Sequence, residues 1–143
     1  MSLPPRPRIV LDTNVCLALF LYADPACARL AALLDACTAV ANQDTRDEWR
    51  RVLQTGRFPF DAERHRQAAA AWDARVDIVE CAAVSTVLPR CRDADDQKFL
   101  ELARDAGAQT LYTRDRELLK LSRRTLRMAG FAVLPPEHAL GVD

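Results

Sequence analysis

Four acidic positions in this sequence are spaced so that they could meet at one site. They are Asp12, Glu48, Asp115 and a cluster of Asp93, Asp95 and Asp96. Each follows a segment that we expect to be a β-strand, and the carboxyl ends of parallel strands meet at one edge of a sheet. Carboxylates gathered in this way repel one another and raise one another's pKa. A divalent cation would relieve this repulsion, and Mg²⁺ and Mn²⁺ prefer such oxygen ligands.

A carboxylate cluster without histidine favours metal-assisted hydrolysis of a phosphodiester. A bound ion can activate a water molecule and stabilise charge on the attacking and leaving oxygens. The only two histidines, His65 and His138, fall in no motif, so a mechanism that needs a histidine pair is not supported. The sequence also lacks the G-x-S-x-G, Walker A, G-x-G-x-x-G and H-E-x-x-H motifs.

Each acid also has a purely structural interpretation. Asp12 and Asp115 could cap the amino termini of helices, where aspartate is favoured. Thr45 and Glu48 match a capping box, in which the glutamate reaches back to the backbone amide at Thr45. The aspartates from 93 to 96 could cap a helix and complement its dipole. Capping explains any one acid well, but it does not explain why all of them follow strands.

The elements that would position these acids alternate between strands and helices. Expected strands are Ile9–Leu11, Thr38–Ala41, Val76–Val79, Gln109–Tyr112 and Phe131–Leu134. Expected helices are Val15–Tyr22, Pro25–Cys37, Thr45–Gln54, Asp61–Trp72, Asp95–Ala106 and Arg116–Met128, the last of them either continuous or broken midway. This order predicts an α/β fold with a parallel sheet of four or five strands flanked by helices. Length predicts a single domain over residues 1–143, with its core at about 7–140.

Composition narrows the class of protein. Formal net charge is zero, so a nucleic acid would have to be bound through local patches or metal ions. Five cysteines without C-x-x-C spacing predict reduced, mostly buried thiols and no zinc site. Met1 to Arg8 holds three prolines and no apolar stretch, and no apolar run is long enough to cross a bilayer. We therefore expect a cytoplasmic protein.

Several segments resemble the motifs of PIN-domain nucleases. The opening segment Ile9–Val15 resembles their first acidic motif, and Glu48 fits the second acidic position. Asp96, which leads into the apolar helix with Phe99, Leu100 and Ala103, resembles the third. Leu111–Asp115 resembles the Thr-x-Asp motif. The tail Pro135–Leu140 resembles that of a VapC-like subgroup, the toxin components of toxin–antitoxin pairs.

The resemblance spans about Pro7 to Leu140 and implies a Rossmann-like, metal-dependent ribonuclease. The implied catalytic and metal-binding acids are Asp12, Glu48, Asp96 and Asp115. Asn14 and Thr113 would orient these ligands, or would serve only in turns. In the third motif, the offset to Ala103 favours Asp96 as the metal ligand, Asp93 is the next choice, and Asp95 stays open.

The mechanism implied is attack by an activated water molecule, without a covalent enzyme intermediate. Asp12, Asp96 and Asp115 would hold the first ion, and Glu48 would hold a second ion or position the water. Arginines could contact the RNA phosphates, with Arg46, Arg50, Arg123 and Arg124 as candidates, unless these side chains form only a solvated surface. Arg123 and Arg124 lie opposite the apolar side of their expected helix.

The resemblance also implies partners. Toxins of this kind form homodimers and are silenced by a small antitoxin protein. The helix pair from Val15 to Cys37 is the expected contact region, although its apolar stripe could equally be core.

Three other functions are considered. A receiver domain would need a second acid beside Asp12, and a haloacid-dehalogenase-like phosphatase would need an aspartate at position 14, where asparagine stands. The third alternative is a non-catalytic PIN-like module that binds RNA or protein. Such modules usually lack one or more of the acids, whereas all four are present here.

Overall fold

The computed structural model describes residues 5–139 and contains one sheet of five parallel strands. The strands are β1 (Arg8–Leu11), β2 (Thr38–Ala41), β3 (Val76–Ile78), β4 (Thr110–Tyr112) and β5 (Ala132–Leu134). Their order across the sheet is β3-β2-β1-β4-β5, and every neighbouring pair is parallel. The predicted α/β fold with a parallel sheet is confirmed. Leu140, the last residue of the tail motif, and the segment 1–4 lie outside the described residues.

The central strand β1 lies at the point where the strand order reverses. From β1 the chain adds β2 and β3 on one side, and then returns to place β4 and β5 on the other. Val10 is paired with Val40 of β2 and with Leu111 of β4. Ligand sites in such sheets form beyond the carboxyl ends of the strands at this reversal. For this chain that place is the edge where β1 and β4 end.

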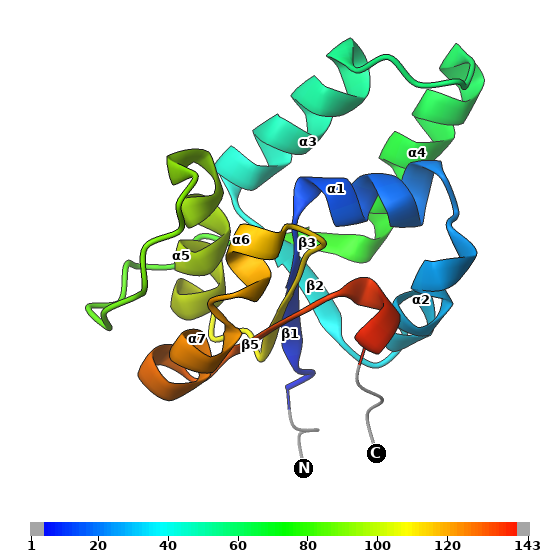
Figure 1. Ribbon diagram of the computed structural model, residues 1–143. Helices are drawn as coiled ribbons and strands as arrows, with labels where there is room; N and C mark the ends of the chain where they lie inside the picture. Colours follow the sequence, from blue (N-terminus) through cyan, green and yellow to red (C-terminus); the bar gives the residue numbers. More distant parts are fainter. Residues whose placement is uncertain (1–4, 140–143) are drawn as a thin grey trace.

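Helices cover both faces of the sheet (Figure 1). One group is α1 (Thr13–Cys16), the π-helical turn η1 (Leu17–Leu21), η2 (Pro25–Cys27), α2 (Ala28–Leu33), α3 (Gln43–Thr55) and α4 (Ala62–Arg75). The other is η3 (Ala94–Asp96), α5 (Gln97–Asp105), α6 (Arg116–Leu119) and α7 (Ser122–Ala129), and the chain closes with η4 (Pro136–His138).

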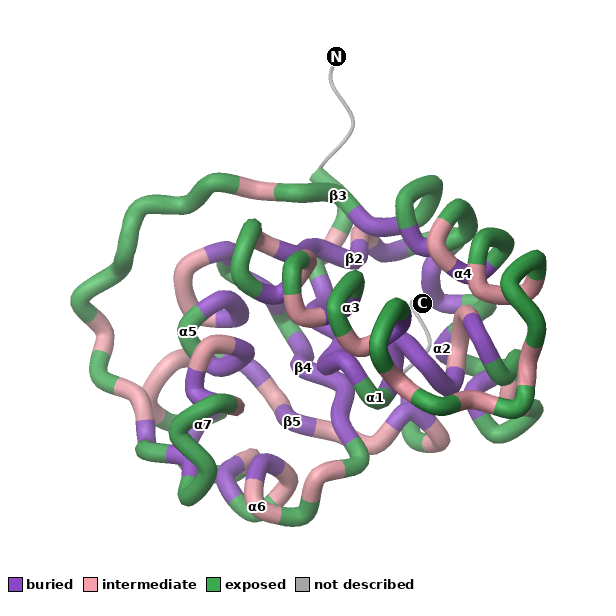
Figure 2. Tube along the Cα trace, turned by 90° about the horizontal axis from the view of Figure 1, so that it is seen from above, coloured by how far each residue is buried: buried purple, intermediate pink, exposed green. Residues whose placement is uncertain are grey.

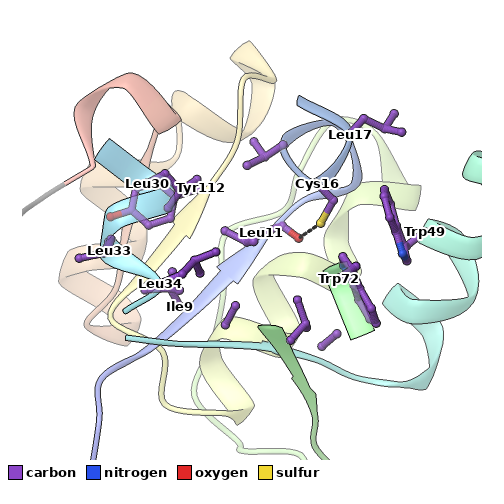
Figure 3. Close-up of a cluster of buried hydrophobic side chains, with 14 of the residues drawn as sticks. Ile9, Leu11, Cys16, Leu17, Leu30, Leu33, Leu34, Trp49, Trp72 and Tyr112 are labelled. Carbon is purple, nitrogen blue, oxygen red and sulfur yellow. Dashed lines mark hydrogen bonds between the residues drawn. The ribbon is translucent and has the colours of Figure 1, made fainter. Parts of the chain in front are cut away.

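The two cores follow from the alternation of side chains along the strands. Ile9 and Leu11 point into the core under α1 to α4, whereas Val10 points into the core under α5 to α7. In the first core the rings of Trp49 and Trp72 stack with centroids 6.0 Å apart (Figure 3). Because both faces of the strands are buried, they appear in the sequence as continuous apolar runs.

Most expected elements are found within a few residues of their predicted bounds. The segment from Arg116 to Met128 is broken, into α6 and α7. Gly107 and Gly130 take positive φ values of 65° and 77° after α5 and α7, a conformation in which glycine ends a helix without strain. The chain between β3 and η3 is a long, largely exposed loop (Figure 2).

The apolar stripe expected on the helix pair from Val15 to Cys37 belongs to the core of the chain itself. Its members Cys27, Leu30, Leu33, Leu34 and Cys37 are all buried. Across residues 5–139, no single helix meets the length and hydropathy of a membrane span, and only the pair Thr13–Leu21 and Pro25–Leu33, bent by 109°, meets them jointly. The five cysteines are free thiols, and all except Cys81 are buried.

Candidate active site

Asp12 lies directly beyond the end of β1 and is only 5% exposed. Its carboxylate caps α1 by accepting from the Val15 amide at 2.8 Å, and it also accepts from the Thr113 hydroxyl. Burial raises its pKa to about 6 against the lowering effect of these two hydrogen bonds, and the charges of Asp115 and Glu48 add to the rise. Asp12 is therefore a capping residue and also a buried acid beside other acids.

Thr113 connects the ends of the two central strands. Its buried hydroxyl donates to Asp12 and accepts from the Asp115 amide at 3.0 Å. Asp115 in turn caps α6 by accepting from the Glu117 amide at 2.8 Å. Thr113 thus lies beside two of the acids, and its hydroxyl fixes the position of Asp12 relative to the Asp115 backbone.

The third acidic segment divides its tasks between its aspartates. Asp93 caps η3 by accepting from the Asp95 amide at 3.0 Å, whereas Asp96 makes no side-chain capping bond to α5. The pKa of Asp96 is raised to about 7. Burial is the largest cause, a hydrogen bond to Asp115 is the next, and the charges of Asp115, Asp93 and Asp12 add to the rise. Burial and the neighbouring carboxylates thus both disfavour the charged form of Asp96.

Glu48 is not part of the capping box that the sequence suggested. The box at the start of α3 is formed by Asn42 and Thr45, whose side chains each accept from the other's amide at 3.0 Å. The helix therefore begins at Gln43, earlier than expected, and Glu48 lies one turn further in. There it accepts from the Thr13 hydroxyl and pairs with Lys98 at 2.6 Å.

The chemistry of these side chains fits a hard divalent cation. Asp12 and Asp96 both have raised pKa values, to which the charge of Asp115 contributes, and all the donor atoms are oxygens. As the side chains stand, no group of three Asp, Glu, His or Cys residues within residues 5–139 has the geometry to hold a metal ion. The donor atoms are thus of the kind that such an ion prefers, while their present arrangement is not that of a metal site.

Asn14, expected to orient the ligands, is exposed on α1. It lines a hollow of about 570 Å³ together with Tyr22, Phe58 and Arg114. The hollow adjoins the rim of the sheet, which is the edge where β1 and β4 end. Two of its residues, Asn14 and Arg114, are near neighbours of Asp12 and Asp115 in the chain. The role of Asn14 toward a metal ligand stays a prediction.

The arginines proposed to contact RNA lie in different surroundings. Arg50 pairs with Asp73 of α4 at 2.9 Å, and Arg46 is half-buried on α3. Arg123 and Arg124 are exposed on α7, which is fastened to β5 by the bond from the Val133 amide to Ser122. In Figure 1, α7 lies level with the starts of the strands rather than with their ends, where the acids are. RNA contact by these side chains stays a prediction.

Two neighbours of the site were not identified from the sequence, namely Thr13 and Lys98. Both contact Glu48. Lys98 stands out in the sequence only as one of two lysines among 20 basic residues. Its position two residues after Asp96 was the available indication that its ammonium group could reach an acid.

Comparisons with known proteins agree with this geometry. Residues 8–117 match the family described as PIN domain. This chain superposes with a TM-score of 0.58 on a chain of a solved structure, that of VapBC2 from Rickettsia felis bound to a DNA fragment from its promoter. The two sequences are 13% identical, and the alignment covers 88% of this chain and 96% of that chain, so the likeness concerns the fold. No curated protein matches this sequence.

Proposed function

This chain belongs to the PIN domain family, and from that premise we propose that it is a ribonuclease that hydrolyses phosphodiester bonds with a divalent cation, Mg²⁺ or Mn²⁺. The observation that carries the proposal is that Asp12, Asp96 and Asp115 lie close together at the edge of the sheet where β1 and β4 end. The pKa of Asp12 and the pKa of Asp96 are both raised, and Asp115 contributes to both shifts. This arrangement disfavours the metal-free fold, and a cation would offset that cost.

The proposed ligands are Asp12, Asp96 and Asp115, and Asp93 is assigned to capping η3. When bound, a divalent cation would acidify a water molecule and neutralise charge on the phosphate. The Thr113 hydroxyl keeps the Asp12 carboxylate turned toward the rim, and the α1 amide at Val15 fixes its other oxygen. Glu48, held by Thr13, is placed to orient the attacking water.

The chemical groups at the ends of the products depend on which nucleophile attacks the phosphorus. If water attacks the phosphorus, the products carry a 5′-phosphate and a 3′-hydroxyl. If the RNA 2′-hydroxyl attacked instead, a 2′,3′-cyclic phosphate would form. The nature of the product ends therefore tests the mechanism independently of the rate.

We further propose that the protein is the toxin of a toxin–antitoxin pair in the cytoplasm, acting as a homodimer. The tail from Pro135 and the fold shared with a VapBC2 chain support this. Since the apolar stripe from Val15 to Cys37 is core, a dimer contact in this region would use the exposed side chains of the same helices, such as Tyr22.

The test is cleavage of a mixed-sequence single-stranded RNA with Mn²⁺, Mg²⁺ or EDTA, by wild-type protein and Asp12→Asn. Asparagine also caps helices well, so the variant should fold. We expect cleavage only with metal and only by the wild-type protein. Absence of cleavage by wild-type protein under all conditions, together with no Mn²⁺ binding in calorimetry, would favour the alternative of a non-catalytic module that binds RNA or protein.

A further inference from the structure

Glu48 differs from the other three acids because a cation already lies against it. Its Oε1 atom is 2.6 Å from the Lys98 ammonium, and its Oε2 atom accepts from the Thr13 hydroxyl. The side chains of Lys98 and Glu48 are only 25% and 17% exposed. An ion pair shielded from water to this extent is held more firmly than a surface pair.

The three aspartates lack such a partner. Within residues 5–139, no lysine, arginine or histidine forms an ion pair with Asp12, Asp96 or Asp115, whereas Glu48 has one. The charges that act on Asp96 come from Asp115, Asp93 and Asp12, whereas the charge of Glu48 acts on Asp12 as the last of the causes that raise its pKa. The acids of the rim therefore divide into an unneutralised aspartate group and a neutralised glutamate.

The stability of the local helix does not explain why a lysine stands at position 98. Lys98 is the second residue of α5, where the positive end of the helix dipole disfavours a cation. The Lys98 ammonium also lies over the ring of Phe99, 5.5 Å from its centroid. The side chain is thus held at the rim and reaches α3 across 50 residues of sequence.

We propose that Lys98 is a positioning residue that fixes Glu48 and takes the place of a second metal ion, so that the site binds one divalent cation. This inference rests on the proposed nuclease function. The single ion would be held by the three aspartates, and Glu48, whose charge is already paired with the Lys98 ammonium, would orient water rather than ligate metal.

The test counts Mn²⁺ ions bound per full-length chain, using the electron paramagnetic resonance signal of free Mn²⁺. We expect one ion for the wild-type protein and for Lys98→Arg, which keeps the charge. Lys98→Met frees Glu48, and we expect it to bind a second ion at Mn²⁺ concentrations where the wild type binds one. Glu48→Gln is the matched control and should bind one ion, because it removes the second site together with its cation.

The outcomes separate this inference from the function on which it rests. Two ions in the wild-type protein, or one ion in a folded Lys98→Met protein, would overturn the role of Lys98 while leaving a metal-dependent nuclease intact. No Mn²⁺ bound by the wild-type protein would overturn the proposed function and this inference together. If Lys98 only joined α3 to α5, Lys98→Met and Glu48→Gln would lower the melting temperature without changing the ion count. Lys98→Gln gives a second neutral variant should the methionine variant misfold.

Discussion

Arg114 and Asp115 are neighbours in the chain, yet they belong to acidic clusters of opposite character. Arg114 extends toward Asp24 and Glu137, with nitrogen–oxygen distances of 3.1 Å and 2.9 Å. The pKa of Asp24 is lowered, first by the Ala26 amide and then by Arg114. Within this Arg114 cluster, the guanidinium group balances part of the negative charge of the two carboxylates.

The rim cluster of Asp12, Asp96 and Asp115 is not balanced. The pKa of Asp12 and the pKa of Asp96 are both raised, and within residues 5–139 no arginine forms an ion pair with either carboxyl group. One peptide bond therefore joins an arginine that lowers the pKa of Asp24 to an aspartate whose charge raises the pKa of Asp12 and of Asp96. This difference supports the proposal that the first cluster serves stability and that the second binds a divalent cation.

The largest effect is expected from removing one charge of the rim cluster. Asp96→Asn should lower kcat/KM for RNA cleavage by at least about 1,000-fold, because metal ligation contributes several kcal/mol of transition-state stabilisation. Asp93→Asn is the matched control, since Asp93 caps η3 and asparagine can do the same. Equal losses in both variants would show that the segment is needed as a whole and that Asp96 has no special role.

The stability of the metal-free protein should fall as the pH rises from about 4 to 7. Asp12 has a pKa near 3.8 when unfolded and about 6 when folded, so below pH 3.8 it is neutral in both states. Above pH 6 it is charged in both states and the folded state carries the full penalty, at most about 3 kcal/mol. Urea unfolding measured across this range would show the decline, which Asp12→Asn should reduce. A difference between the wild-type protein and Asp12→Asn that does not change between pH 4 and 7 would contradict the raised pKa of Asp12.

Thr113→Val should lower activity by about 10- to 100-fold, the usual cost of losing a group that orients a metal ligand. The variant keeps the shape of the side chain but loses the hydroxyl that joins Asp12 to the Asp115 amide. Thr113→Ser, which restores the hydroxyl, should recover most of the rate. If serine does not restore activity, the methyl packing of Thr113 matters more than its hydrogen bonds.

The smallest effect is expected in the Arg114 cluster. Arg114→Met should lower the free energy of unfolding by about 1 kcal/mol, because its ion pairs are partly exposed to solvent. The kcat of RNA cleavage should stay within a factor of about three, because Arg114 is not one of the proposed metal ligands and a large loss of transition-state stabilisation is expected only for those. A fall in kcat as large as that of Thr113→Val would remove the distinction between the two clusters.

Local sequence patterns are sufficient to predict the strands and the positions of several acids. Continuous apolar runs such as Ile9–Leu11 predict strands buried on both faces, and Asp12 follows the run directly because local periodicity decides where a strand ends. The order of strands and helices then places Asp12 and Asp115 at one edge of a parallel sheet. These features depend on residues a few positions apart, which is the range over which a sequence pattern can be interpreted.

Which partner each side chain meets depends on how the elements pack together. The spacing of Thr45 and Glu48 matches a capping box, the structural alternative to a role of Glu48 in the site, but Asn42 forms the box with Thr45, and Glu48 instead meets Thr13 and Lys98. The bond from Thr113 to Asp12 joins residues 101 positions apart. Such contacts depend on how helices pack on the sheet, and because packing is set by the shapes of two whole cores, no local pattern in the sequence specifies them.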